Sequence, residues 1–323
     1  MILTITLNPL LERRLIFDQI SAGEVNRTSL EEFKAGGKGI NVSRQLNHLK
    51  VQNLAITFLG GSNGKILRRI LTEEEINFSA VNTKEETRSA CLAIEKNETR
   101  ITSLFGPNPG LQKNEIDEIK SKIEKAVINS SIVVLSGSSP SKEANELFAQ
   151  IIDLCHEHDK ISVLDTYGGH LKSCIEKAPT IVHNNIEETE KSLGIKLDTE
   201  EEITKYLDYL YSCGVKLSFV TNGAEIGYAS KFDFKYKFES PVVSPVDPTG
   251  SGDAFVAGLI YGMEESMIFS DFLTFAAAAG TANCTKWSVC GSSFGEIREY
   301  VPLIKISPVG KKMKIIDDSP NYQ

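Results

Sequence analysis

Short runs of β-branched and aliphatic residues alternate along most of the chain with longer segments in which apolar residues recur at helical spacing. Such alternation is typical of parallel strands joined by helical crossovers. We expect a first strand at the amino end, then strands at residues 54–59, 132–135, 161–164, 180–182 and 217–221, and helices at residues 113–129, 141–159 and 199–213. The pattern predicts an α/β fold with a doubly wound, mainly parallel sheet flanked by helices.

Two segments do not follow this alternation, residues 10–34 and residues 76–105. Within the second segment, residues 90–94 and 100–104 have the character of an antiparallel strand pair. Antiparallel strands set apart from a parallel core predict a small β-sheet lid over one face of the domain. The alternative is a hairpin at the edge of the main sheet.

The carboxyl-terminal tail differs in composition from the rest of the chain. From Ser307 onward it contains three lysines, two prolines and an Asp-Asp pair, which is typical of a solvated segment. We therefore expect one domain over residues 1–305, which includes the lid strands, and a C-terminal extension over residues 306–323.

The composition is that of a soluble globular protein. The chain has 323 residues, of which 41% are hydrophobic, and its formal net charge is -8. This acidic balance argues against broad binding of nucleic acid or an anionic membrane, and no apolar run reaches the roughly 18–20 residues of a membrane helix. The six cysteines include no Cys-x-x-Cys pair and do not cluster with histidine at ligand spacing, so we expect a cytoplasmic protein without a zinc site.

The sharpest chemical signal is residues 246–253, Val-Asp-Pro-Thr-Gly-Ser-Gly-Asp, directly before an apolar helical stretch. Glycines before a helix let the backbone turn and point free N–H groups outward, and the helix dipole adds positive potential. The backbone of Gly250, Ser251 and Gly252 is therefore suited to hold a phosphoryl group. Asp253 could accept a proton from a hydroxyl that attacks this group, although an isolated Asp at such a position is more often a helix cap.

A second glycine-rich site, residues 35–44, precedes another amphipathic helix. Gly37 and its neighbouring glycines permit close approach of the backbone, Lys38 supplies a cation, and Asn41 offers a donor and an acceptor to a polyol. These residue types suit a phosphorylated or hydroxylated ligand. Neither this site nor residues 60–66 has the residues of a P-loop at its spacing, and neither glycine cluster matches the dinucleotide-binding fingerprint.

Together and in this order, the two glycine-rich sites resemble the two signatures of the PfkB-type, ribokinase-like carbohydrate kinase family. Other motifs fall in the family's order: Thr6-Leu7-Asn8-Pro9, Phe58-Leu59-Gly60-Gly61, Thr87-Arg88, Ser136-Gly137-Ser138, Leu164-Asp165-Thr166 and Asn185-Ile186-Glu187-Glu188. The resemblance implies a ribokinase-like fold over residues 1–305. The Asn-Pro and Gly-Gly-Lys-Gly-Ile-Asn-Val-Ser-Arg forms are most similar to the phosphosugar branch that contains 1-phosphofructokinase and tagatose-6-phosphate kinase.

The resemblance implies that Asp253 is the catalytic base, next to an anion hole formed by the backbone of Gly250, Ser251 and Gly252. It also implies binding of ATP and Mg²⁺. The residues implied for the nucleotide are Asn185, Thr221, Gly223, Gly250 and Gly252, and those implied for the metal are Asn185 and Glu188. On its own, an Asn-x-x-Glu at a helix start is usually a capping arrangement.

On the acceptor side, Arg88 aligns with the arginine that binds the existing phosphate of the acceptor in the phosphosugar branch. A guanidinium suits such a dianion because it can form bidentate bonds. Lys38 bridges either the acceptor phosphate or the transferred group, and the sequence leaves both open. The other residues implied for the acceptor are Glu12, Gly37, Asn41 and Ser138.

Three motifs depart from the family pattern. Glu12 stands where the branch has Asp, His183 stands where the family has Lys, and Ser139 follows Ser138 where the family has Leu. A glutamate places its carboxylate one methylene farther out than an aspartate. These changes predict altered specificity or weakened catalysis.

We therefore expect an enzyme that transfers the γ-phosphoryl group of ATP to a hydroxyl of a phosphorylated ketohexose, namely the 6-hydroxyl of fructose 1-phosphate. The alternatives are another acceptor, such as tagatose 6-phosphate, fructose 6-phosphate or an unphosphorylated sugar or nucleoside, and a catalytically weak regulator that binds sugar phosphates. By analogy with the family, we expect a homodimer formed through the small sheets.

Overall fold

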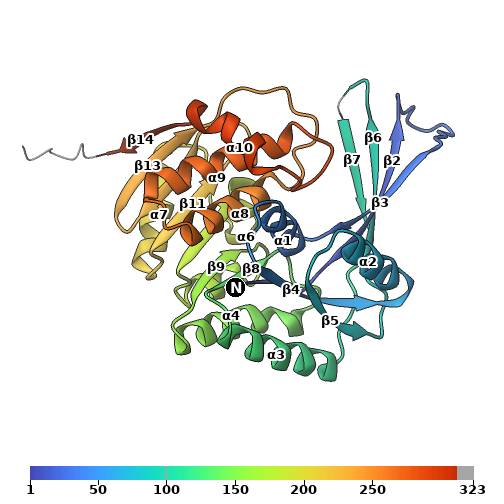
Figure 1. Ribbon diagram of the computed structural model, residues 1–323, viewed down its shortest axis with the longest axis horizontal. Coiled ribbons are helices and arrows are strands. Elements are labelled where there is room, and N and C mark those ends of the chain that lie inside the picture. Colours follow the sequence, from blue (N-terminus) through green and yellow to red (C-terminus); the bar gives the residue numbers. More distant parts are fainter. Residues whose placement is uncertain (99, 311–323) are drawn as a thin grey trace, which may run out of the picture.

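The computed structural model describes residues 1–98 and 100–310, which form two β-sheets and the helices around them (Figure 1). The larger sheet has ten strands. In spatial order they are β14 (Lys305–Val309), β13 (Phe234–Glu239), β12 (Gly227–Lys231), β11 (Leu217–Thr221), β10 (Ile181–Asn185), β9 (Ile161–Asp165), β8 (Ile132–Ser136), β1 (Ile2–Thr6), β4 (Asn53–Gly60) and β5 (Phe78–Thr83).

The strands from β11 to β5 all pair in parallel, as the alternating pattern predicts. Each of the five expected internal strands overlaps an observed one, and the first strand is β1. The strands β12, β13 and β14 continue the sheet with antiparallel pairing. Because the parallel strands point the same way, their carboxyl ends meet at one edge, where ligands bind in open α/β sheets.

Helices cover both faces of the main sheet. They are α1 (Lys38–His48), α2 (Gly61–Glu73), α3 (Lys113–Ile128), α4 (Lys142–Glu157), α5 (Leu171–Ile175), α6 (Ile186–Leu193), α7 (Glu200–Ser212), α8 (Ser251–Glu264), α9 (Phe269–Cys284) and α10 (Phe294–Tyr300), followed by a 3-10 turn at Val301–Leu303. On one face α3, α4, α5 and α7 pack on buried side chains such as Leu3 and Val133, and on the other α1, α8 and α9 pack on Ile2 and Val134. Successive strand residues thus point to opposite cores, as in a doubly wound fold.

Among the described helices, none has the length and apolar character required to cross a membrane.

A second, four-stranded sheet stands apart from the main sheet (Figure 1). Its strands in spatial order are β3 (Leu30–Gly36), β2 (Leu10–Phe17), β6 (Ser89–Glu95) and β7 (Arg100–Phe105). The antiparallel pairing of β6 with β7 confirms the expected strand pair, and the alternative of an edge hairpin is wrong. The expected lid segment begins too early, because Phe78–Thr83 pairs in parallel with β4 as the last strand of the main sheet. We refer to these four strands as the small sheet.

The main sheet also extends past the boundary expected at residue 305. Strand β14 pairs with β13, with Ile306 opposite Phe238, and Ile306 packs against the core beneath α8 and α9. This apolar contact explains why the first residues of the expected extension belong to the domain. Residues 311–323 of that extension lie outside the described residues.

Helices α8 and α9 approach closely at Gly258, and this contact should be sensitive to one methyl group. A Cβ at Gly258 would lie 2.7 Å from the backbone Cα of Ala276. We expect Gly258→Ala to lower the free energy of unfolding by about 1–3 kcal/mol, because the helix backbones must separate. Gly295→Ala in α10 is the matched control, since nothing lies within 4 Å of its new methyl group, and it should be neutral or stabilising. Equal urea midpoints for the two variants would contradict this packing.

Candidate active site

The loop before α8 forms a pocket of backbone N–H groups at the helix start. Gly250 is the N-cap residue and adopts a left-handed conformation with φ of 77°, and a Cβ there would lie 2.4 Å from the side chain of Val289. Glycine is therefore required at this turn. The N–H groups of Gly252 and Asp253 lie in the first helical turn, which has no intrahelical acceptors for them. The arrangement suits an oxyanion or a phosphoryl group.

Asp253 lies beside this pocket and is almost completely buried. The side-chain amide of Asn41, in α1, donates a hydrogen bond of 2.7 Å to Asp253 Oδ2. Burial and the negative charge of Asp165 raise the pKa of Asp253 to about 7, although Lys38 and the Asn41 hydrogen bond act in the opposite direction. A carboxyl group with this pKa can take up a proton near neutral pH.

Lys38, the first residue of α1, points between two carboxylates, Asp165 at the end of β9 and Glu188 in the first turn of α6. Its Nζ lies 2.7 Å from Glu188 Oε2 and 3.2 Å from Asp165 Oδ1. Burial opposes the charged form of Lys38, but Asp165, Glu188 and Asp253 together raise its pKa well above the ordinary lysine value. The site therefore contains a permanently protonated cation among three acidic groups.

Asp165 ends strand β9 and is the most deeply placed acid of this cluster. Although burial opposes ionisation, Lys38 and His183 lower the pKa of Asp165, and His183 Nδ1 lies 3.1 Å from Asp165 Oδ1. Asp165 Oδ2 is buried and has no hydrogen-bond partner. Together with Glu188, this free oxygen fits the preference of Mg²⁺ for one or two carboxylates plus phosphate oxygens and water. Asn185 Oδ1 instead caps α6 by accepting the N–H of Glu188 at 3.4 Å.

Arg88 and Ser138, two of the residues expected on the acceptor side, both contact Asn8. Arg88 Nη2 donates to the Asn8 carbonyl at 3.0 Å, and Asn8 Nδ2 donates to Ser138 Oγ at 3.0 Å. Among the described residues, no carboxylate lies within ion-pair distance of Arg88. Burial lowers the pKa of Arg88, but an arginine side chain stays charged in proteins. A guanidinium without an acidic neighbour is free to bind an anion.

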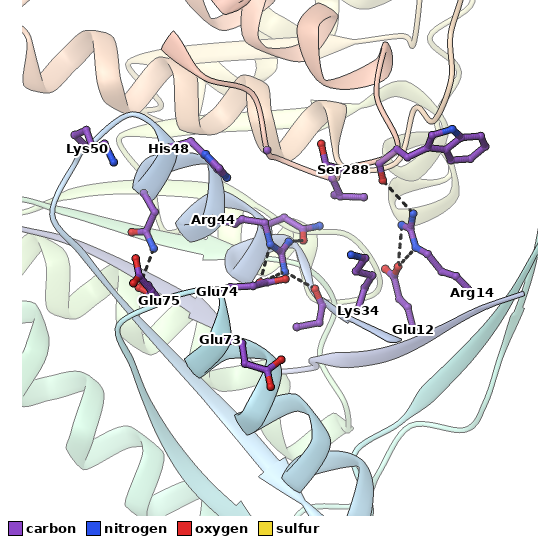
Figure 2. A pocket seen from close by; sticks show the side chains of 16 residues that line it. Glu12, Arg14, Lys34, Arg44, His48, Lys50, Glu73, Glu74, Glu75 and Ser288 are labelled. Atoms are coloured by element: carbon purple, nitrogen blue, oxygen red, sulfur yellow. Dashed lines mark hydrogen bonds and ion pairs between the residues drawn. The ribbon is translucent and has the colours of Figure 1, made fainter. Parts of the chain in front are cut away.

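Glu12 does not stand alone in the site, because it belongs to a buried ion triad. Its Oε2 accepts hydrogen bonds from Arg14 Nε at 3.1 Å and from Arg14 Nη2 at 3.0 Å (Figure 2). Arg14 Nη1 lies 3.0 Å from Asp247 Oδ2. Glu12 Oε1 lies against Gly36, where a Cβ would approach it to 2.6 Å.

A cavity of about 500 Å³ adjoins Glu12 and Asn41, between α1, the end of α2 and the loop that carries Trp287 (Figure 2).

The remaining expected residues lie around this centre at different distances. Thr221 Oγ1 lies 3.1 Å from His183 Nε2, which joins it to Asp165, and a Cβ at Gly252 would come within 3.2 Å of the His183 ring. Ser251 Oγ accepts a hydrogen bond from Asn283, and Gly37 turns into α1 with φ of 128°. Gly223 lies in the open turn after β11, and the contacts of the described residues do not join it to the cluster.

The sequence alone indicates no role for Asp165, Asn283 or Arg14. Asp165 carried a usable signal, because it is an acid at the carboxyl end of an apolar strand. Asn283 is a buried amide in an alanine-rich helix, and its Nδ2 donates to the Thr249 carbonyl at 2.9 Å, which fixes the loop before α8. Arg14 gave no signal, since it follows another arginine in an alternating strand.

Comparisons with known proteins identify the family of this assembly. The family model of the pfkB family carbohydrate kinases matches residues 4–293. The chain belongs to the pfkB family of carbohydrate kinases. As a member of this family, it is a sugar kinase, and ATP is implied as its phosphoryl donor.

Similar proteins support the same conclusion for this kinase over nearly its whole length. It is 28% identical over 310 residues to a 1-phosphofructokinase of Borreliella burgdorferi (96% and 99% of the two chains) and 30% identical over 312 residues to a tagatose-6-phosphate kinase of Staphylococcus epidermidis (95% and 100%). Its fold is similar to that of phosphofructokinase-2 from Escherichia coli, with a TM-score of 0.86, 23% identity and coverage of 94% and 98%. These relatives establish a phosphosugar kinase with a ribokinase-like fold.

The raised pKa of Asp253 in this kinase has a consequence for stability. Between the ordinary aspartate pKa and about 7, the folded state holds a proton that the unfolded state has released, so the group lowers stability progressively as pH rises to about 7. We expect Asp253→Asn to be more stable than the wild type, by an amount that grows to the order of a few kcal/mol at pH 7 and then stays level. Urea unfolding between pH 5 and 8.5 measures this difference.

The control for this titration is Asp233→Asn, in the exposed turn between β12 and β13. Its effect on the free energy of unfolding should be small at every pH. A stability difference for Asp253→Asn that does not change between pH 5 and 7 would show that Asp253 ionises like an ordinary aspartate.

Proposed function

We propose that this kinase transfers the γ-phosphoryl group of ATP to the 6-hydroxyl of fructose 1-phosphate in a Mg²⁺-dependent reaction, which forms fructose 1,6-bisphosphate. The observation that carries the proposal is the position of Arg88. It is a partly buried cation without an acidic partner among the described residues, on the same side as Asn8 and Ser138. A phosphate already present on the acceptor is the group that such a guanidinium binds best.

In this reaction Asp253 takes the proton of the acceptor hydroxyl as its oxygen bonds to the γ-phosphorus. The bond from phosphorus to the β–γ bridging oxygen breaks, and ADP leaves. The N–H groups at the start of α8 stabilise charge on the transferring group, because they are fixed in place before the reaction. The side-chain amide of Asn41 keeps the Asp253 carboxylate oriented toward the acceptor.

The groups around Lys38 serve the nucleotide side of the reaction. Asp165 and Glu188 would hold Mg²⁺ with phosphate oxygens and water, with Asn185 supporting Glu188 through the start of α6. When bound, the metal neutralises charge on the phosphate oxygens. Lys38 then binds a phosphate of the nucleotide in addition to its two carboxylates. Thr221, at the end of β11, and Gly223, in the turn that follows, lie along the nucleotide phosphates.

The small sheet supports a homodimer through the face that points away from Glu12. Phe33 and Leu104 lie in one row across its four strands and are 40% and 61% exposed. Exposed apolar residues aligned on a sheet face favour a covering partner, and a second copy of the chain offers the same row in return. Use of ATP and six free thiols fit a cytoplasmic location.

Tagatose 6-phosphate is the second candidate acceptor. The kinase is 30% identical to a protein named tagatose-6-phosphate kinase, and it is 28% identical to one named 1-phosphofructokinase. A coupled assay of ATP consumption with fructose 1-phosphate, fructose 6-phosphate, tagatose 6-phosphate and free sugars separates them. We expect fructose 1-phosphate to have the highest kcat/KM; a higher value for any other acceptor would reassign the substrate, and binding without turnover would indicate a regulator.

Arg88→Ala tests the role of the acceptor phosphate. We expect the KM for the phosphorylated acceptor to rise roughly 10- to 100-fold, because one charged hydrogen-bonding group is lost, while the KM for ATP stays within about twofold. The matched control is Arg69→Ala on the exposed surface of α2, which should leave both constants unchanged. An unchanged acceptor KM in Arg88→Ala would mean that the acceptor carries no phosphate at this position.

A further inference from the structure

Arg14 is a buried arginine to which neither the family pattern nor the reaction above gives a role. It extends from β2 of the small sheet, is 2% exposed, and lies next to Glu12 (Figure 2). Its Nε and Nη2 bind Glu12 Oε2, and its Nη1 binds Asp247 Oδ2 at 3.0 Å and the Trp287 carbonyl at 3.4 Å. One guanidinium therefore joins the small sheet to the loop before α8.

The Asp247 end of this link leads directly to the anion hole. Asp247 is 1% exposed, and its Oδ1 accepts the N–H of Thr249 at 2.9 Å, one residue before Gly250. Arg14 thus holds one oxygen of a carboxylate whose other oxygen fixes the turn. Two successive contacts therefore connect Arg14 to the backbone directly before the N–H groups of α8.

The Glu12 end leads to the acceptor side. Because Oε2 accepts two N–H groups from Arg14, Oε1 is the oxygen that Glu12 has left for a sugar hydroxyl, and Gly36 leaves room for it. The longer glutamate side chain is thereby held back by the arginine two residues later. With Arg14 as its partner, Glu12 can serve in place of the shorter aspartate that the phosphosugar branch has at this position.

The charges explain why an arginine is required here. Two carboxylates and one guanidinium are buried together, and a planar guanidinium can donate to both acids at once, whereas a lysine ammonium lacks this fork geometry. Removal of the cation would leave two uncompensated negative charges in the interior, which is strongly unfavourable. Separation of the small sheet from the loop before α8 would therefore leave buried charges without partners.

We propose that Arg14 is a positioning residue that couples the small sheet to the anion hole. The same side chain then fixes the positions of the Glu12 carboxylate and of the N–H groups of α8. The part that concerns Glu12 rests on the proposed acceptor site. The small sheet and the anion hole then reach their productive geometry together, and phosphoryl transfer to water is suppressed when they do not.

The first test is Arg14→Met, assayed for both sugar bisphosphate and ADP. We expect kcat/KM for the acceptor to fall roughly 10- to 100-fold, because the reacting groups are misplaced. The ratio of ADP to sugar bisphosphate should rise above one. The matched control is Arg100→Met, which breaks another arginine–glutamate pair of the small sheet, Arg100 at the start of β7 with Glu95 at the end of β6. It should lower stability without changing the ratio.

A double variant separates positioning from folding. In Arg14→Met/Asp247→Asn the cation and one of its two acids are both neutralised, so the melting temperature should recover toward the wild-type value. If Arg14 positions the site, the ratio of ADP to product stays high in this variant. Recovery of the wild-type ratio together with stability, or a wild-type ratio in Arg14→Met itself, would overturn the proposal.

Fluorescence of the single tryptophan gives a readout that does not need turnover. The Trp287 carbonyl accepts a hydrogen bond from Arg14, so sugar phosphate binding should change the Trp287 emission in the wild type and in Arg100→Met, but not in Arg14→Met at saturating ligand. The same change in all three proteins would overturn the coupling. If no sugar phosphate binds the wild type, the proposed function fails instead. The Arg14–Asp247 link is then tested by a double-mutant cycle on the free energy of unfolding. Additive effects of the Arg14 and Asp247 substitutions would overturn the link.

Discussion

The hydrogen bond from Asn41 to Asp253 joins the two glycine-rich segments of the chain, and the geometry of the whole site depends on it. It fixes a buried carboxylate at the start of α8, where free N–H groups and the helix dipole also point. Burial and Asp165 raise the pKa of this carboxylate to about 7, while Lys38 limits the rise. The protein thus maintains a buried carboxyl group in a place where an isolated negative charge would be unfavourable.

The fold supplies this arrangement through the edge where the parallel strands end. Asp165 ends β9, Asn185 ends β10, and Ser138 follows β8 closely, so groups far apart in the sequence converge beside the start of α1. The small sheet adds Glu12 from β2, and Arg14 ties this sheet to the loop before α8. Departures from the family pattern at Glu12 and His183 have partners in the structure: Arg14 holds the first, and the second lies between Asp165 and Thr221.

Local patterns in the sequence were sufficient to predict the alternating core, the two glycine-rich sites and the separate small sheet. They placed Asp253 and Lys38 in the site because glycines and charges there have a local chemical meaning. They could not predict that β5 joins the main sheet or that β14 completes it, because strand pairing is decided by distant apolar contacts such as that of Ile306. The triad of Arg14 was equally hidden, since Glu12 and Asp247 are brought together only by the tertiary fold.

The most direct test of the central claim is the pH dependence of kcat/KM for the phosphorylated acceptor, because this quantity reports ionisation in the free enzyme. If Asp253 is the base, kcat/KM of the wild type rises with pH and levels off above about 7, and Asp253→Asn lowers it by roughly 10²–10⁴-fold. A pH-independent profile, together with wild-type turnover in Asp253→Asn, would contradict the account.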